Sequence, residues 1–287
     1  RGLGDVYKRQ VYVHIKKELS PFYAEEEASA MAKWISSDIL HLSTLELYTG
    51  KDMNFSTKEW EELEDILRRL KQREPLQYIL QEASFCGMSF HVEQGVLIPR
   101  PETEELVEWI VSDYREAGQV RILDIGTGSG CIPVSLAQLL PEAQVSSCDV
   151  SAEALRIAAM NIKRYGDKVT LFCADILKEE LPECQVDVLV SNPPYITESE
   201  RTDMEANVLD WEPELALFVP DSDPLRFYRR IAWKGLDWLS EGGALYFEIN
   251  RAYGAETVRM LEELGYRQIE LRKDLSGNDR MIKAIRP

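Results

Sequence analysis

The sequence predicts an α/β protein with a mostly parallel sheet, preceded by a small helical bundle. Strand-like and helix-like apolar patterns alternate from about residue 119 onward, whereas residues 11–75 show helical periodicity and no strand pattern. A glycine-rich loop stands where the first predicted strand turns into a helix. Such alternation specifies a parallel sheet covered by helices on both faces, so a ligand site is expected at the carboxyl ends of its strands.

Length and composition set the limits of this interpretation. The 287 residues suffice for one large and one small domain. Neither an apolar run of about 18 residues nor a signal peptide is present, so we expect no membrane span and a cytoplasmic protein. The five cysteines are scattered and the three histidines are isolated, which disfavours disulfides and metal sites. With no coiled-coil pattern, a monomer is expected.

The formal net charge of −17 bears on the partner. A protein that holds a nucleic-acid duplex usually presents a basic surface, so a direct nucleic-acid substrate is disfavoured. An acidic enzyme suits a basic macromolecule or a small substrate. A solvated acidic surface that serves solubility alone is equally compatible.

The N-terminal part divides into three segments. Residues 1–10 lack periodicity and resemble read-through of non-native sequence or a disordered end, so they are left out of the fold prediction. Residues 11–75 predict a helical domain with one helix over 23–42 and another that opens at Ser56, where Ser56 and Glu59 have the form of a capping box. Pro75 breaks this helix. Residues 76–98 then alternate as one or two short hairpins that link two domains.

Residues 99–287 form the predicted α/β domain. Pro99 to Pro101 is a rigid corner, followed by an amphipathic helix over 102–114. The expected strands are 120–125, 144–150, 169–175, 186–191, 243–249, 268–273 and 281–285, and the expected helices are 131–140, 151–164, 224–239 and 255–264.

The segment Asp124 to Gly130 is the first candidate ligand loop. Its glycines permit left-handed backbone angles and a close approach to a ligand. A dinucleotide fingerprint would have Gly or Ala where Cys131 stands, and Asp124 would repel a pyrophosphate. The loop therefore fits S-adenosylmethionine better than NAD; a glycine turn without a ligand is the alternative. The expected cofactor residues are Asp124, Gly126, Thr127, Gly128, Ser129 and Gly130.

Two more strand ends carry candidate cofactor residues. Asp149 ends the second strand about twenty residues after the loop, where a carboxylate can accept both ribose hydroxyls. Its alternative is a favourable charge at the start of the next helix. Asp175 and Ile176 end the third strand and are expected near the adenine, with a turn-forming aspartate as the competing interpretation.

The tetrapeptide Asn192-Pro193-Pro194-Tyr195 ends the fourth strand and indicates methyl transfer to a planar NH2 group. The lone pair of such a nitrogen is delocalised and must localise before it can attack a methyl group. The Asn192 side-chain carbonyl and the Pro193 backbone carbonyl can each accept one N–H and favour the charge that grows on nitrogen. Tyr195 can lie on the planar group. A Pro-Pro turn without function is the alternative.

Together these residues resemble the release factor glutamine methyltransferases of the HemK/PrmC type. The resemblance covers nearly the whole chain from about residue 20. Besides the two loops above, it rests on Glu74-Pro75 with Gln77-Tyr78, Leu97 to Glu104, Glu212-Pro213 with Ala216-Leu217, Glu248-Ile249 and Asp274 to Arg280.

The resemblance implies a seven-stranded, Rossmann-like class I domain that uses S-adenosyl-L-methionine and releases S-adenosyl-L-homocysteine. The implied substrate is the glutamine of the Gly-Gly-Gln motif in class 1 peptide chain release factors, methylated at N5. By this resemblance Asn192 would contact both cofactor and substrate. Pro193, Pro194 and Tyr195 would grip the glutamine amide, Arg100 and Glu102 would border the pocket, and the helical domain would dock the release factor.

Three positions depart from the family pattern. Ile176 stands where many members carry an aromatic residue, Asn250 replaces a glycine, and Tyr253 replaces a glutamine. We expect a weaker adenine contact at Ile176. The last two are expected to lie away from the motif residues and to be neutral.

Two alternatives remain. An adenine-N6 methyltransferase acting on DNA or RNA shares the same nitrogen chemistry, but it must flip a base and hold phosphates, which the net charge disfavours. A non-catalytic adapter of the same fold would need neither the glycine loop nor Asn192.

Overall fold

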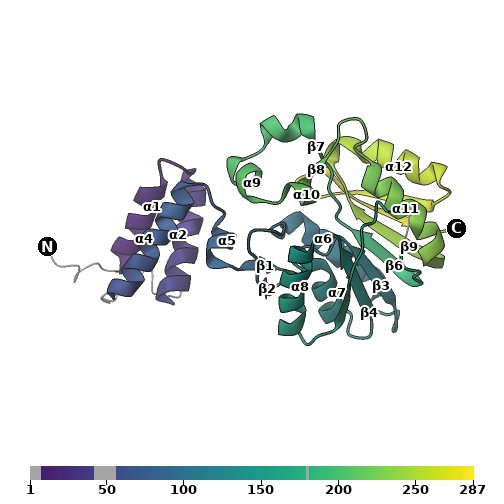
Figure 1. Ribbon diagram of the computed structural model, residues 1–287, viewed down its shortest axis with the longest axis horizontal. Helices are drawn as coiled ribbons and strands as arrows, with labels where there is room; N and C mark the ends of the chain where they lie inside the picture. The colour runs from purple at the N-terminus through teal and green to yellow at the C-terminus, as the bar shows by residue number, and fades with distance from the viewer. Residues whose placement is uncertain (1–7, 42–55, 179–180) are drawn as a thin grey trace. The chain divides into compact units, whose positions relative to one another are not determined.

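The computed structural model describes residues 8–41, 56–178 and 181–287 of the chain (Figure 1). Two compact units are present, residues 1–80 and residues 81–287. The first contains helices only among its described residues, and the second contains the large sheet.

The first unit is built from helices α1 (Lys8–Leu19), α2 (Glu25–Leu40), α4 (Thr57–Lys71) and α5 (Leu76–Leu80). The predicted capping box is present, because Ser56 accepts from the Glu59 amide and the Glu59 carboxylate accepts from the Ser56 amide. Such a cap contributes about 1 kcal/mol to helix stability. The unit has its own core, which includes Ile15, Leu19, Ala28, Ile35, Leu67 and Leu70.

The segment boundaries differ from those expected. Helix α1 begins at Lys8, so three of the first ten residues are helical, while residues 1–7 and the predicted helix end at residue 42 lie outside the described residues. Pro75 begins helix α5 instead of a hairpin, since its carbonyl accepts from the amides of Tyr78 and Ile79. Within residues 76–98 the hairpin that forms, β1 (Ala83–Phe85) with β2 (Met88–Phe90), belongs to the second unit.

The second unit confirms the predicted α/β fold with a seven-stranded sheet. The strand order is β10-β11-β9-β6-β3-β4-β5. Strands β9, β6, β3, β4 and β5 are parallel. Strand β11 is antiparallel to both of its neighbours, β9 and β10, so it alone in this sheet runs in the opposite direction. The bounds are β3 (Arg121–Ile125), β4 (Gln144–Asp149), β5 (Val169–Cys173), β6 (Val186–Ser191), β9 (Leu239–Glu248), β10 (Arg267–Lys273) and β11 (Asp279–Ile285). Strands β4 and β5 lie on one side of β3, and β6 and β9 lie on the other. The carboxyl ends of β3, β4 and β6 therefore form a topological switch point.

Helices cover both faces of this sheet (Figure 1). Side chains of successive strand residues point to opposite faces, so Ile122 joins one buried cluster and Leu123 the other. The first cluster packs under α6 (Pro101–Tyr114), α7 (Cys131–Leu139) and α8 (Ala152–Arg164); the second packs under α11 (Arg226–Trp238) and α12 (Gly254–Glu263).

Between β6 and α11 the chain makes an excursion that the periodicity did not predict. It begins with β7 (Ile196–Thr197) and continues through the 3-10 helix η1 (Glu198–Asp203), α9 (Ala206–Trp211) and α10 (Glu214–Leu217). It returns through β8 (Phe218–Val219), which pairs with β7 in parallel. A second 3-10 helix, η2 (Arg251–Tyr253), follows β9.

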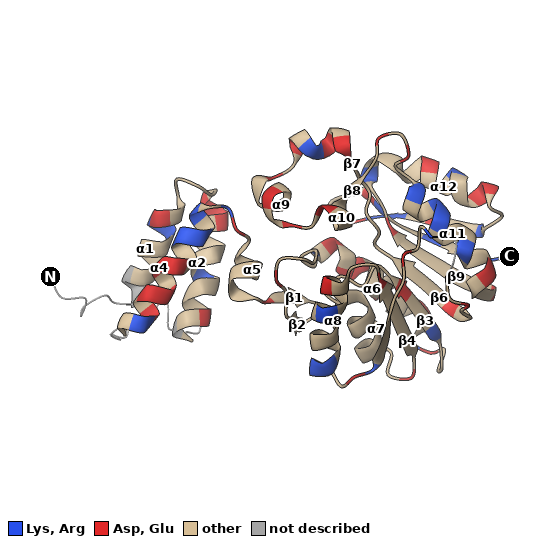
Figure 2. Cartoon of the chain, viewed as in Figure 1, with Lys and Arg blue, Asp and Glu red and all other residues tan. Residues whose placement is uncertain are grey.

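Charged side chains are distributed over both units (Figure 2). Acidic residues recur along the excursion, whereas helix α11 carries Arg226, Arg229, Arg230 and Lys234. Within the described residues, no helix is long and apolar enough to cross a membrane.

Candidate active site

The glycine loop follows β3 and is fastened to the neighbouring strand. The amides of Gly126 and Thr127 donate to the Cys148 carbonyl over 2.9 and 3.0 Å. Gly126 and Gly128 have φ of +87° and +54°, and a Cβ added to either would meet no atom within 4 Å. Side chains are therefore disfavoured here by the backbone angle, and the space beside both glycines is free for a ligand.

Asp149 organises the same loop from the end of β4. Its Oδ2 accepts from the Gly128 amide at 3.0 Å, and its Oδ1 accepts from the Ser151 amide at 2.9 Å. A carboxylate has about four acceptor positions, so both oxygens keep capacity for ligand hydroxyls. The Ser151 side chain also caps α8 as predicted, accepting from the Ala154 amide.

Asp124 lies beneath the loop. It is fully buried, and its Oδ2 accepts from the Ser147 hydroxyl at 2.6 Å, while its Oδ1 has no partner among the described residues. Burial, with a smaller contribution from Asp149, raises the pKa of this carboxyl to about 8. Asp124 is not among the residues that line the adjoining cavity. Its contacts support the loop from below.

The strand ends enclose a cavity of about 300 Å³, which we call the glycine-loop cavity. Asp175 and Ile176 lie on its wall, and the turn they form is held by the guanidinium of Arg230, whose Nε donates to the Ile176 carbonyl at 2.9 Å. Phe227 lines the same cavity and provides an aromatic ring where Ile176 does not. Neither Phe227 nor Arg230 was singled out from the sequence. The lining includes Gly126, Thr127, Gly128, Ser129, Asp149, Val150, Asp175, Ile176, Leu177, Ser191, Asn192, Pro193 and Pro194.

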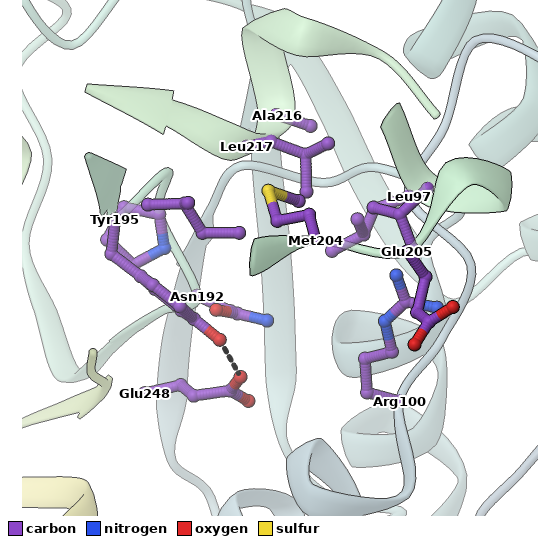
Figure 3. Close-up of a pocket in the computed structure, with 12 residues that line it drawn as sticks. Leu97, Arg100, Asn192, Tyr195, Met204, Glu205, Ala216, Leu217 and Glu248 are labelled. Carbon is purple, nitrogen blue, oxygen red and sulfur yellow. Dashed lines mark hydrogen bonds between the residues drawn. The ribbon is translucent and has the colours of Figure 1, made fainter. Parts of the chain in front are cut away.

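The Asn192 to Tyr195 loop separates this cavity from a second one. Ser191 anchors the loop by donating to the Ile125 carbonyl at 2.6 Å. The second cavity, of about 220 Å³, we call the Tyr195 cavity; Figure 3 shows the Asn192 side-chain amide between Tyr195 and Arg100 in this view. Both cavities share the wall residues Leu97, Arg100, Asn192, Pro193 and Ala216. A group in one cavity can therefore meet a group in the other at Asn192 and Pro193.

Glu248, at the end of β9, forms part of the Tyr195 cavity and holds the tyrosine. The Tyr195 hydroxyl donates to Oε1 at 3.1 Å (Figure 3). The Thr103 hydroxyl donates to Oε2 at 2.5 Å. Burial raises the pKa of both Tyr195 and Glu248. The phenol therefore stays protonated and remains a donor. Arg280 lies near the same hydroxyl, with Nη1 at 3.5 Å.

Arg100 and Glu102, both expected at the pocket border, have different positions. Arg100 lines both cavities and donates from Nη2 to Glu212 at 2.6 Å, and the Glu212 carboxylate also accepts from the Ile98 amide at 3.0 Å. Glu102 lies in the first turn of α6 and lines neither cavity.

One of the two C-terminal departures, Asn250, contacts the motif, contrary to expectation. Asn250 is 5% exposed, and its Nδ2 donates to the Tyr195 carbonyl at 3.0 Å. Tyr253 packs against the same buried cluster as Tyr195. Because β9 ends beside β6 in the sheet, residues that follow Glu248 reach the loop that follows Ser191. Asn250 and Tyr195 are 55 positions apart in the sequence, so no local pattern indicated this contact.

The described residues contain no group of three or more His, Cys, Asp or Glu side chains that could hold a metal ion. The site offers instead the Asp149 carboxylate in the glycine-loop cavity and the oxygens of Asn192 and Pro193 at the wall that both cavities share.

Comparison with family models matches both units. The Methyltransferase small domain model matches residues 103–210, and the PrmC N-terminal domain model matches residues 10–80. Three curated relatives carry the name release factor glutamine methyltransferase. The protein of Bacteroides thetaiotaomicron is 50% identical over 96% of this chain and 99% of its own. That of Flavobacterium psychrophilum is 42% identical over 92% and 94%, and that of Streptococcus pneumoniae is 37% identical over 95% and 96%.

Solved structures show the same fold at lower identity. A methyltransferase from Pyrococcus furiosus is 18% identical with a TM-score of 0.51, covering 70% of this chain and 90% of that one. A human methyltransferase 10 domain containing protein gives the same values.

Proposed function

The chain belongs to the release factor glutamine methyltransferase family, and we propose that it methylates N5 of the glutamine in the Gly-Gly-Gln motif of class 1 peptide chain release factors, with S-adenosyl-L-methionine as donor. The observation that carries the proposal is the shared wall. Asn192 and Pro193 line both the glycine-loop cavity and the Tyr195 cavity, so a donor and an acceptor held in the two would face each other there.

The glycine-loop cavity fits adenosylmethionine in its chemistry. Open space beside Gly126 and Gly128 admits the methionine part, Asp149 can accept from ribose hydroxyls, and the apolar wall at Ile176 and Phe227 suits adenine. Bound adenosylmethionine would supply an electrophilic methyl group and leave as S-adenosylhomocysteine. Asp124, which is buried and does not line the cavity, supports the loop through the Ser147 hydroxyl.

The residues of the shared wall would orient and activate the substrate amide. Asn192 Oδ1 and the Pro193 carbonyl each accept one N–H of the glutamine NH2, which aims the nitrogen lone pair at the methyl group and favours the positive charge that develops there. Tyr195, fixed by Glu248, lies on the planar amide. The nitrogen becomes acidic only after transfer, so the proton then leaves without a strong base.

The helical unit is proposed to contribute to release-factor docking. Support comes from its match to the PrmC N-terminal domain. The net charge of −17 favours a basic protein surface over nucleic acid as the partner.

Methyl transfer with labelled adenosylmethionine tests the proposal. The enzyme is incubated with a release factor, with the same factor carrying Gln→Ala in its Gly-Gly-Gln motif, and with DNA. Label on the unaltered factor alone is expected. Label that persists on the Ala variant would move the target to another residue, and label on DNA alone would favour an adenine methyltransferase; either result contradicts the proposal.

A further inference from the structure

Asn250 connects the end of β9 with two points of the chain that follows β6, the Tyr195 backbone and the Glu200 side chain at the start of the excursion. One Nδ2 contact is to the Tyr195 carbonyl at 3.0 Å, and the other is to the Glu200 carboxylate, with Oε2 at 3.0 Å and Oε1 at 3.2 Å. The amide group has two protons and here meets an acceptor on each side. Its Oδ1 accepts from the Ala252 amide at 2.9 Å and so caps η2.

Glu200 transmits this contact to the start of the excursion. Its Oε2 accepts from the Thr197 amide and from the Thr197 hydroxyl, both at 2.8 Å, and so caps η1. The carboxylate therefore fixes the point where the chain leaves β7. Asn250 adds the bond that connects this point to β9.

The excursion is the part of the wall that faces the Asn192 to Tyr195 loop. Met204, Glu205 and Val208 line the Tyr195 cavity from the excursion, and Tyr195 lines it from the loop (Figure 3). The loop ends at Tyr195 and the excursion contains Glu200, the two acceptors of Asn250. A glycine at position 250 has no side-chain donor for either acceptor, so these hydrogen bonds depend on the asparagine.

Resting on the proposed function, we propose that Asn250 is a positioning residue for the substrate: it holds the excursion, through Glu200, against the Tyr195 backbone and thereby fixes the width of the cavity that receives the glutamine side chain. The residue touches neither proposed ligand. Its loss should weaken release-factor binding and leave the glycine-loop cavity unchanged.

Asn250→Asp tests this, because it keeps the cap on Ala252 and turns the Nδ2 donor into an oxygen that faces Glu200. Amide hydrogen exchange in residues 198–211 of the free enzyme is expected to rise about tenfold, the effect of losing one hydrogen bond to a charged group. The KM for the release factor is expected to rise by a similar factor, while the Kd of adenosylmethionine changes less than about twofold and kcat less than KM.

Asn250→Asp combined with Glu200→Gln restores a donor between residues 200 and 250 but leaves the Tyr195 carbonyl without one, so it is expected to recover part of both effects. Gln144→Glu adds the same charge at the exposed amino end of β4 and controls for net charge. Exchange and KM equal to this control would overturn the proposal, as would exchange that rises across the whole sheet without recovery in the double variant. If the wild-type enzyme methylates no release factor, the proposed function fails, while the exchange comparison still decides whether Asn250 joins the two segments.

Discussion

The glycine-loop cavity and the Tyr195 cavity share a wall but are built differently. The first lies where β3, β4 and β6 end, and its main features belong to the backbone: left-handed glycines and amides that point to Asp149 and Cys148. The second is lined by side chains that come from distant parts of the sequence, with Tyr195 bonded to Glu248, which Thr103 holds from the side of the first cavity. The first therefore depends on local conformation and the second on tertiary packing.

This difference predicts how each cavity responds to substitution. A backbone site tolerates side-chain changes that leave the loop angles intact and fails when a glycine gains a Cβ. A packed network is sensitive to single hydrogen bonds, and its members should show coupled effects.

The largest effect is expected at the shared wall. Asn192→Ala removes the acceptor proposed for the substrate amide, so kcat should fall about 10²- to 10³-fold, as for the loss of an oriented transition-state group. The Kd of adenosylmethionine, measured by calorimetry, should stay within about tenfold. Asn207→Ala on α9, which lines neither cavity, is the matched control. Equal turnover of the Asn192 variant and the wild type would remove Asn192 from the chemistry.

A Cβ in the glycine loop should give the next largest effect. Gly128→Ala strains a residue with φ of +54° and places a methyl group in the free space of the cavity, so adenosylmethionine affinity should fall about 30-fold. Gly166→Ala has the same type of strain at φ of +92° but lines neither of these two cavities, and should lower stability without changing affinity. Equal affinity losses in the two variants would show that strain alone is responsible.

Coupling between Glu248 and Tyr195 should be smaller but measurable. Glu248→Gln keeps the size of the side chain and removes its charge, and kcat should fall about tenfold because the tyrosine ring is held less firmly. The same substitution in a Tyr195→Phe background should have a much weaker effect, since the bonded hydroxyl is already absent. Independent, multiplicative effects in this double-mutant cycle would mean that the carboxylate does not act through Tyr195.

The smallest effect concerns Asp124 and its pH dependence. Its pKa is about 8 in the folded protein and near 4 when unfolded. Between these values the folded state keeps a proton that the unfolded chain releases, so rising pH through this window destabilises the fold. Asp124→Asn should remove this pH dependence. The Tm of the variant minus the Tm of the wild type should therefore increase by a few degrees between pH 5 and pH 9.

Adenosylmethionine affinity of the Asp124 variant should change only about threefold. A loss above about a hundredfold would instead make Asp124 a direct ligand contact.

Much of the fold could be predicted because its signals are local. The alternation of strands and helices, the Ser151 cap and the Ser56 capping box depend on neighbouring residues, and all are present. The excursion was missed because its elements have two to six residues, too short for a hydrophobic period. Helix α5 was taken for a hairpin since a proline that ends one helix can also begin the next.

The residues of the candidate site also divide into those with a local sequence signal and those without one. Asp149, the glycines and the Asn192 loop are recognisable because strand ends in a parallel sheet converge. Glu248, Phe227 and Arg230 have no local signature, and Asn250 was taken as neutral because its partners lie about 50 residues away. Arg100 precedes α6 as its N-cap with extended backbone, whereas Glu102 lies in the first helical turn, and the segment pattern does not resolve which of the two reaches the cavities.

The shared wall has a consequence for inhibition. Two cavities of about 300 and 220 Å³ that meet at Asn192 and Pro193 can be filled by one molecule, an adenosine joined through a short alkyl bridge to a glutamine-like amide. Once one half is bound, the other binds intramolecularly at a high effective concentration, so the joined compound should exceed either half in affinity by orders of magnitude. Selectivity over other methyltransferases of this fold would come from the amide half, since the adenosine half occupies the part of the site that backbone geometry defines.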